Sequence, residues 1–200
     1  MFGSGKVVSL QRSVDKADLA ARTRQAASAL DSLGIGEGDA IAAFMCNDFP
    51  LFEAQCAAAL LGAYFVTVNW HLRGTEAEYI LTDSEAKALI VHAHLLAEIG
   101  DMIPAGIAVF VVPTPDDIAA AYRIDAASCA APDGARDWRD WIAAFAEWSA
   151  APRAARGLVF YTSGTTGLPK GVFQHPASAD QAAVGAQVGD IAYGPRPGMR

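Results

Sequence analysis

The sequence has few charged residues and few cysteines, and each scarcity excludes a class of protein. Only 18% of its 200 residues are charged and 52% are hydrophobic, which is typical of a folded chain and not of a disordered one. The net charge of −7 argues against binding nucleic acid or an anionic membrane through a broad basic surface. The three cysteines form no Cys-x-x-Cys pair, so we interpret Cys46, Cys56 and Cys129 as reduced core thiols of a cytoplasmic protein.

Several motifs of targeting and catalysis are also absent. Residues 1–10 have no apolar core, so no export signal is evident. The apolar stretch 49–70 is interrupted by Glu53 and Asn69 and divided by Gly62, which favours a helix and a buried strand over a membrane span. Neither a Gly-x-Ser-x-Gly elbow nor a Ser-His-Asp order is present, so esterase chemistry has no support.

Helical and strand-like patterns alternate along the chain, which predicts an α/β fold with a mostly parallel sheet flanked by helices. We expect strands over residues 40–46, 64–68, 87–92 and 107–112, and helices over 19–33, 49–60, 75–83, within 113–132 and over 177–188. No internal repeat is present, and no linker separates two full domains. We therefore expect the chain to be the first part of a larger protein.

Local signals add detail to this outline. The helix over 49–60 is expected to be capped by Asn47 or Asp48. Its inner stripe is expected to consist of Phe49, Phe52, Cys56 and Leu60. Thr75 and Glu78 match a capping box for the next helix. Four aromatic residues share one face of a later helix, where core packing is favoured over a docking surface: Trp138, Trp141, Phe145 and Trp148.

Histidines and glycines elsewhere give weaker signals. His92 and His94 have the spacing of metal ligands on a strand, but no cluster of carboxylates or cysteines accompanies them, which favours a structural role. His71 follows a strand end, where it faces either a site or solvent. The glycine cluster at 34–38 follows a predicted helix and precedes a predicted strand. A dinucleotide-binding fingerprint has the opposite order, strand and then helix, so a tight turn is favoured here.

The most informative segment is the loop over residues 161–171, which reads Tyr-Thr-Ser-Gly-Thr-Thr-Gly-Leu-Pro-Lys-Gly between two short apolar runs. Gly164 and Gly167 let backbone N–H groups turn inward around an anion. Lys170 adds a compact positive charge that suits phosphate. Four hydroxyl side chains add donors, those of Thr162, Ser163, Thr165 and Thr166. The loop therefore predicts a polyphosphate site, which we favour over a flexible surface loop.

The spacing of Lys170, three residues after Gly167, does not fit the kinase-type phosphate loop, whose lysine follows the last glycine directly. Residues 161–172 instead resemble the signature loop of the adenylate-forming superfamily, which includes acyl-CoA synthetases, luciferases and the adenylation domains of peptide synthetases. Weaker likenesses lie over residues 33–47 and 61–84. The sequence over residues 61–84 is most similar to those of the fatty-acid and aryl-acid CoA ligases.

This resemblance implies an ATP-dependent ligase that adenylates a carboxylic acid, with fatty acids favoured, and passes the acyl group to coenzyme A. Lys170 is the implied catalytic residue, because its charge lies next to the phosphates, and Thr162 is the implied contact to Mg²⁺. The partners that the resemblance implies are therefore the acid, ATP and coenzyme A; from charge and hydropathy we expect neither nucleic acid binding nor an integral membrane segment. The residues implied to wrap the phosphates are Thr162, Ser163, Gly164, Thr165, Thr166 and Gly167.

The resemblance also implies that residues 1–200 form an incomplete N-terminal adenylation domain, without the family's mobile C-terminal domain. We expect such a chain to be unable to complete adenylation alone. Two alternatives stay open: a truncated, non-catalytic nucleotide-binding module and a partial gene product. The choice of acid is not readable, because the acyl pocket of the family lies mostly beyond this sequence.

Overall fold

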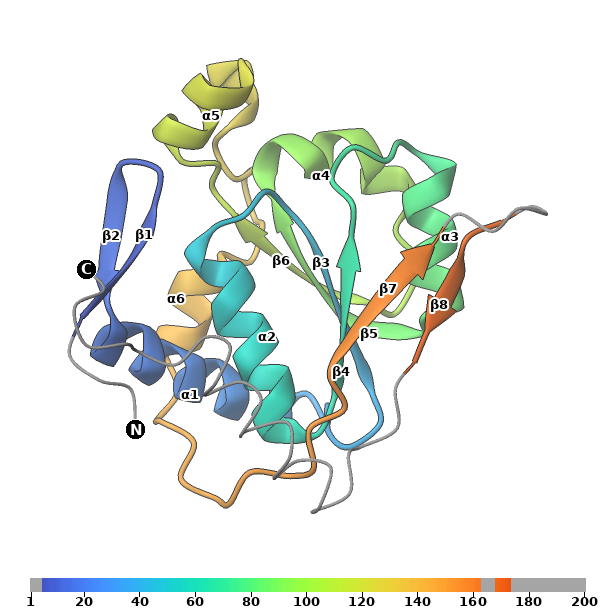
Figure 1. Ribbon diagram of the computed structural model, residues 1–200. Helices are drawn as coiled ribbons and strands as arrows, with labels where there is room; N and C mark the ends of the chain where they lie inside the picture. Colours follow the sequence, from blue (N-terminus) through green and yellow to red (C-terminus); the bar gives the residue numbers. More distant parts are fainter. Residues whose placement is uncertain (1–4, 163–167, 174–200) are drawn as a thin grey trace, which may run out of the picture.

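A six-stranded sheet with helices on both faces forms the body of the protein in this computed structural model, which describes residues 5–162 and 168–173 (Figure 1). The strand order is β6-β5-β3-β4-β7-β8; the pairs from β6 to β7 are parallel and β8 is antiparallel to β7. The expected α/β fold is thus confirmed. The strands are β3 (Ala40–Phe44), β4 (Tyr64–Val68), β5 (Ala86–His92), β6 (Ala108–Val112), β7 (Leu158–Thr162) and β8 (Lys170–Val172).

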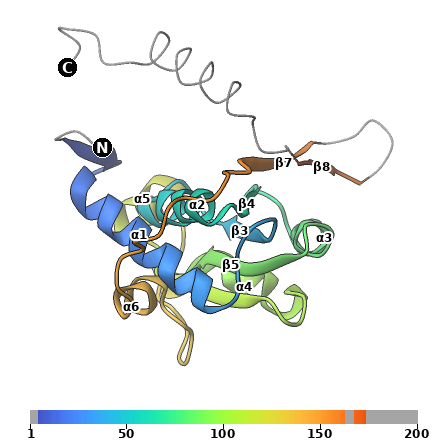
Figure 2. The same cartoon turned by 90° about the horizontal axis from the view of Figure 1, so that it is seen from below.

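Two layers of helices cover the sheet, and each encloses its own apolar core (Figure 2). One layer consists of α1 (Lys16–Ser32), α2 (Phe49–Leu61) and α6 (Trp138–Ala143), and the other of α3 (Thr75–Asp83) and α4 (Ala93–Ile99). A further short helix, α5 (Asp116–Tyr122), follows β6. Within the described residues, no helix has both the length and the apolar character that crossing a membrane requires. The helix expected over 177–188 lies outside those residues.

An antiparallel hairpin of β1 (Lys6–Ser9) and β2 (Arg12–Asp15) precedes α1 and is absent from the expectations above. Most of its side chains are exposed, so its sequence carries little hydrophobic alternation. Arg12 forms ion pairs with Asp48 and Asp117, which belong to two other parts of the chain. These ion pairs attach the hairpin to the start of α2 and to α5, in addition to the burial of Val14.

Helix α2 turns a different face to the core from the one expected. Phe49 is buried, but Phe52 is 43% exposed, and Cys56 and Leu60 are only half-buried. Asp48 is confirmed as the cap, since its carboxylate accepts a hydrogen bond of 2.8 Å from the Phe49 N–H. Small side chains on this face, mainly alanines, let α1 pack closely against it, so the predicted stripe of Phe52, Cys56 and Leu60 is wrong. The other core-facing residues of α2 are Pro50, Glu53, Ala54, Ala57, Ala58 and Leu61.

The expected capping box of α3 is wrong. Thr75 is the first helical residue, and the cap position belongs to Gly74, which has a φ of +45° and no side chain to bond with. Glu76 reaches back in place of Glu78 and accepts a long hydrogen bond of 3.4 Å from the backbone of Arg73. A positive φ suits glycine, so the turn chemistry at Gly74 decides where the helix begins.

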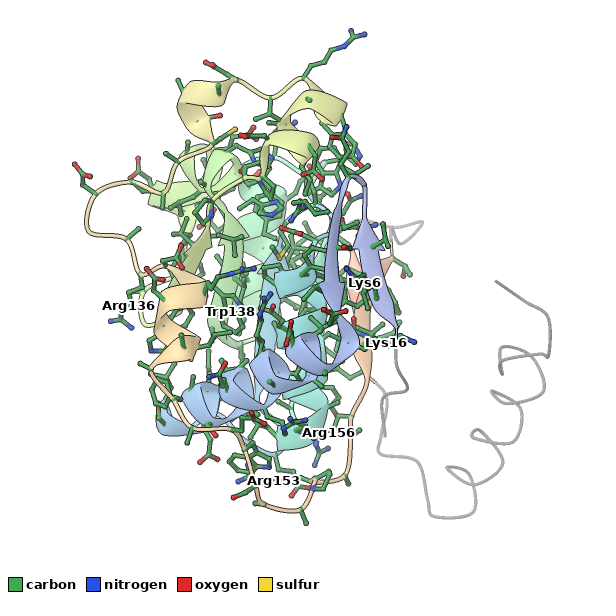
Figure 3. The ribbon with its side chains drawn as sticks, turned by 90° about the vertical axis from the view of Figure 1, so that its left-hand side faces the viewer. Lys6, Lys16, Arg136, Trp138, Arg153 and Arg156 are labelled. Carbon is green, nitrogen blue, oxygen red and sulfur yellow. The ribbon has the colours of Figure 1, made fainter. Side chains whose placement is uncertain are left out.

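The aromatic residues before β7 pack against the core as predicted, although only Trp138 is fully buried, and the expected shared helix face is wrong because α6 ends at Ala143, before Phe145 and Trp148. Trp138 is fully buried and points inward from α6 (Figure 3), where its Nε1 donates a hydrogen bond of 2.9 Å to Glu53. Trp141 stacks on Phe110 of β6 at 3.9 Å between ring centroids. Burial raises the pKa of Glu53, whereas the hydrogen bond from Trp138 opposes that rise. This corner of the core therefore combines large aromatic surfaces with one buried carboxyl group.

Candidate functional site

The hairpin of β7 and β8 carries the predicted phosphate loop at the edge of the sheet (Figures 1 and 2). β7 adds to β4 in parallel, through Phe65 opposite Leu158 and Val66 opposite Val159. β8 then runs back antiparallel to β7, so the chain reverses direction between them. The two apolar runs that flank the motif in the sequence are thus confirmed as strands that hold its two ends together.

The register of this hairpin places two predicted site residues directly opposite each other. Thr162, the last residue of β7, faces Lys170, the first residue of β8. Opposite residues of an antiparallel pair lie on the same face with Cβ atoms about 5 Å apart. Both side chains are exposed. A hydroxyl donor and an ammonium group therefore leave the neck of the loop on one face, which is a donor set that suits phosphate.

The remaining predicted site residues, Ser163, Gly164, Thr165, Thr166 and Gly167, lie outside the described residues. The described part of the loop continues with exposed Leu168 and half-buried Pro169. Among the described residues, no group of three or more His, Cys, Asp or Glu side chains is placed to hold a metal ion. A Mg²⁺ ion at the neck would thus depend on phosphate oxygens, with the Thr162 hydroxyl as the described protein ligand that suits it.

The opposite face of the hairpin packs on the protein. Tyr161 pairs with Gly171, and its hydroxyl donates a hydrogen bond of 2.7 Å to Asp83 at the end of α3. A Cβ on Gly171 would lie 2.9 Å from the Tyr161 ring, so only glycine leaves room for it. Beyond β8, Phe173 meets the ring of Tyr64 edge-on at 5.1 Å. Sequence reasoning missed this packing, because Asp83 is 78 residues from Tyr161 and carries no local signal for it.

A second polar cluster lies at the carboxyl ends of β3 and β5, where open α/β sheets usually bind ligands. Here Arg12 of the β1–β2 hairpin fills the position. Its Nη1 lies 2.7 Å from Asp48 and its Nε lies 2.8 Å from Asp117. Burial works against the charge of Asp48, but hydrogen bonds from His92 and Arg12 hold its pKa below the usual value. The cluster therefore serves as an internal anchor for the hairpin, and its Arg12 and Asp48 also line a cavity of about 280 Å³.

The two buried histidines belong to this anchor and its surroundings. His92 Nδ1 accepts a hydrogen bond of 3.2 Å from the Cys46 N–H, which places its proton on Nε2, 3.5 Å from Asp48. His94 Nδ1 lies 2.7 Å from the Thr114 hydroxyl. Burial, together with the charges of His92 and Arg73, lowers the pKa of His94 to about 4. These contacts are structural, in agreement with the role favoured from the sequence.

Comparison with known proteins gives consistent results. A family model described as AMP-binding enzyme matches residues 6–193. Long-chain-fatty-acid–CoA ligase of Thermus thermophilus is 31% identical to this chain over 184 residues, which are 88% of this chain and 32% of the relative. Indoleacetate–CoA ligase of Aromatoleum aromaticum is 32% identical over 80% of this chain and 30% of the relative. The chain thus spans about a third of the length of these curated relatives.

Solved structures share the fold. The anthranilate CoA ligase AuaEII in complex with anthranoyl-AMP superposes with a TM-score of 0.65 at 26% identity, covering 81% of this chain and 30% of that one. Apo MatB from Rhodopseudomonas palustris superposes with a TM-score of 0.67 at 22% identity, covering 91% and 33%. The sheet order and helix layers described above are therefore those of a known architecture.

Proposed function

Because this chain belongs to the AMP-binding enzyme family and corresponds to the N-terminal part of an adenylate-forming acyl-CoA synthetase, we propose that its β7–β8 hairpin binds the phosphates of ATP in an acid–thiol ligase. The observation that carries this proposal is the pairing of Thr162 with Lys170 at the neck of the signature loop. The pairing directs a hydroxyl and a positive charge to the same side of the hairpin, as a polyphosphate requires.

The proposed reaction begins with attack of a carboxylate oxygen on the α-phosphorus of ATP. A P–O bond to the acid forms, the bond to the β-phosphate oxygen breaks, and pyrophosphate leaves with the electron pair. Both reactants are anionic, so the protein contributes positioning and charge neutralisation. Lys170 offsets negative charge on the phosphates, and the Thr162 hydroxyl donates to a phosphate oxygen or contacts Mg²⁺. When bound, Mg²⁺ supplies further neutralisation of the phosphate oxygens.

The acyl adenylate then reacts with a thiol, which we propose is that of coenzyme A, and AMP leaves. For the acid we propose a fatty acid, because the long-chain-fatty-acid–CoA ligase matches most of this chain. Relatives named for indoleacetate and anthranilate make an aromatic acid the competing substrate class. We place the reaction in the cytoplasm, since the three cysteines suit a reducing compartment.

We also propose that residues 1–200 are an incomplete N-terminal adenylation domain that binds the triphosphate but does not complete adenylation alone. The support is the share of the relatives that the chain spans, about a third. Pyrophosphate release should therefore stay at background when the chain is given ATP, Mg²⁺ and a panel of fatty and aryl acids. Sustained release above that background would contradict this part of the proposal.

The phosphate site itself is tested by calorimetric titration of the chain with MgATP and with inorganic tripolyphosphate. Lys170→Ala should weaken binding of both about ten- to a hundredfold, because it removes a charge-assisted contact. Lys6→Ala, at an exposed lysine of β1, is the matched control and should bind as the unchanged chain does. Absence of binding by the unchanged chain, or equal affinities of the two variants, would refute the proposed function.

A further inference from the structure

The two faces of the β7–β8 hairpin have different surroundings. Successive residues of a strand point to opposite faces, so Tyr161 and Thr162 cannot share one. Thr162 and Lys170 are exposed, whereas Tyr161 and Gly171 are half-buried. The direction of Tyr161 toward α3 thus decides the direction of the proposed phosphate contacts, because turning Tyr161 outward would turn Thr162 inward.

The contact that holds Tyr161 is specific. Its hydroxyl donates to Asp83 Oδ2 at 2.7 Å, while the hydroxyl of Tyr79 donates to Asp83 Oδ1 at 3.3 Å. Asp83 therefore accepts one tyrosine on each carboxylate oxygen, and the shorter bond goes to the loop hairpin. Burial, followed by the hydrogen bond and charge of Asp83, raises the pKa of Tyr161, so its hydroxyl keeps its proton and remains a donor at neutral pH.

Gly171 leaves the space that the Tyr161 ring occupies. A Cβ added at Gly171 would lie 2.9 Å from Cζ and 3.0 Å from the hydroxyl oxygen of Tyr161, and 3.0 Å from the Phe173 ring. The tyrosine ring therefore lies across the backbone of β8 on its way to Asp83. One side chain thereby contacts β7, β8 and α3 together. β7 pairs with β4 through two residue pairs, so the outer part of the hairpin is oriented by side-chain contacts, those of Tyr161 with Asp83 and of Phe173 with Tyr64.

We propose that Tyr161 is a positioning residue, whose bond to Asp83 sets the orientation of Thr162 and Lys170 toward a triphosphate. This inference rests on the proposed function and adds a residue to it. Tyr161 does not touch the ligand; it acts through the strand that carries Thr162. Loss of this bond should lower the affinity for the triphosphate, because Thr162 and Lys170 would no longer be held in one orientation. The chain should stay folded, because the bond lies on one hairpin at the edge of the sheet.

The experiment is calorimetric titration of the 200-residue chain with inorganic tripolyphosphate and with MgATP, together with urea unfolding. Tyr161→Phe removes the hydroxyl and should weaken both affinities about three- to tenfold, the range expected for one hydrogen bond. The matched control is Tyr79→Phe, which takes a hydroxyl from the same carboxylate but has no link to the loop. It should leave both affinities within twofold. Both variants should keep a cooperative unfolding transition, so that a change in affinity does not come from loss of the fold.

Variants of the acceptor give an independent readout. Asp83→Asn keeps an oxygen that accepts from Tyr161 and should preserve affinity, whereas Asp83→Ala should match Tyr161→Phe. The double variant Tyr161→Phe, Asp83→Ala should lose no more than either single change, because both remove the same bond. Amide exchange at residues 171–172 should speed up in Tyr161→Phe and not in Tyr79→Phe. If Tyr161→Phe fails to fold, the comparison of Asp83→Ala with Asp83→Asn decides.

The outcomes separate this inference from the proposed function. If the unchanged chain binds the triphosphate and Tyr161→Phe and Asp83→Ala bind it equally well, the positioning role is overturned and the phosphate site stands. If the unchanged chain does not bind it, both are overturned. A loss of affinity in Tyr79→Phe equal to that in Tyr161→Phe would also overturn the positioning role. The loss would then come from a change in α3 and not from the bond between Tyr161 and Asp83.

Discussion

Replacing Asp48 by alanine is the sharpest test of the internal anchor that fills the carboxyl ends of β3 and β5. Asp48 is 2% exposed. Its Oδ1 accepts from the Phe49 N–H at 2.8 Å and from Arg12 Nη1 at 2.7 Å, and its Oδ2 lies 3.5 Å from His92 Nε2. The change therefore removes a helix cap, one arm of an ion pair and a contact to a buried histidine at once.

The expected cost follows from these contacts. Loss of the cap costs about 1 kcal/mol. Loss of the ion pair adds about 1 to 2 kcal/mol, a figure below that for fully buried pairs because Arg12 is 31% exposed and keeps Asp117. The free energy of unfolding should thus fall by about 2 to 3 kcal/mol in total. Asp48→Asn keeps a capping oxygen and should cost roughly half as much.

Urea unfolding followed by circular dichroism measures this loss. For a chain of this size the slope is about 2 to 3 kcal/mol per molar urea, so the midpoint should fall by about 1 M for Asp48→Ala. Asp31→Ala is the control, because Asp31 also pairs with an arginine, Arg153, but is 41% exposed. That variant should lose less than about 0.5 kcal/mol. Equal losses in the two alanine variants would refute the anchor.

Two further predictions concern stability. His94 has a pKa of about 4 in the folded chain against an ordinary value of 6.5, so the unfolded chain takes up a proton first and stability falls as pH drops from 6.5 toward 4. Urea midpoints across that range should therefore converge between the unchanged chain and His94→Gln, and a constant difference would contradict this assignment. Gly62→Ala should cost more than Gly34→Ala by urea unfolding, about 2 against about 1 kcal/mol. Both glycines have positive φ, but only at Gly62 would the new Cβ meet other atoms, Arg153 Cβ at 3.0 Å among them, so equal costs would show that the close contact does not matter.

The parts of the fold that hydrophobic periodicity determines were predictable from the sequence. The strand over 64–68 has the predicted bounds, and the other central strands differ by one or two residues at an end. The β1–β2 hairpin was not predictable in this way, because ion pairs of Arg12 with residues 36 and 105 positions away hold it. The buried face of α2 was mispredicted because alanines pack there and Phe52 points outward.

The candidate site, like the fold, was only partly predictable from the sequence. Its chemistry is local, because glycines, hydroxyls and one lysine in a short loop indicate phosphate without any knowledge of the fold. Its geometry is not local, because the pairing of Thr162 with Lys170 depends on strand register. No local pattern in the sequence brings Asp83 to Tyr161, since the two residues are 78 positions apart and meet only through the tertiary fold. The sequence therefore predicts candidate donors to a ligand, whereas the contact of Tyr161 with Asp83 is visible only in the structure.

The candidate site lies at the carboxyl edge of the sheet, because Thr162 ends β7, which runs parallel to β4. The chain passes from β4 back over β3 to β5, so the strand order reverses at β3, the place where such sheets commonly bind ligands. In this protein Arg12 occupies that place, held by Asp48 and Asp117. The antiparallel turn from β7 to β8 offers another route, because it brings two strand ends together and directs Thr162 and Lys170 to one side. The hairpin ends in the edge strand β8, and the bond from Tyr161 to Asp83 connects it to α3.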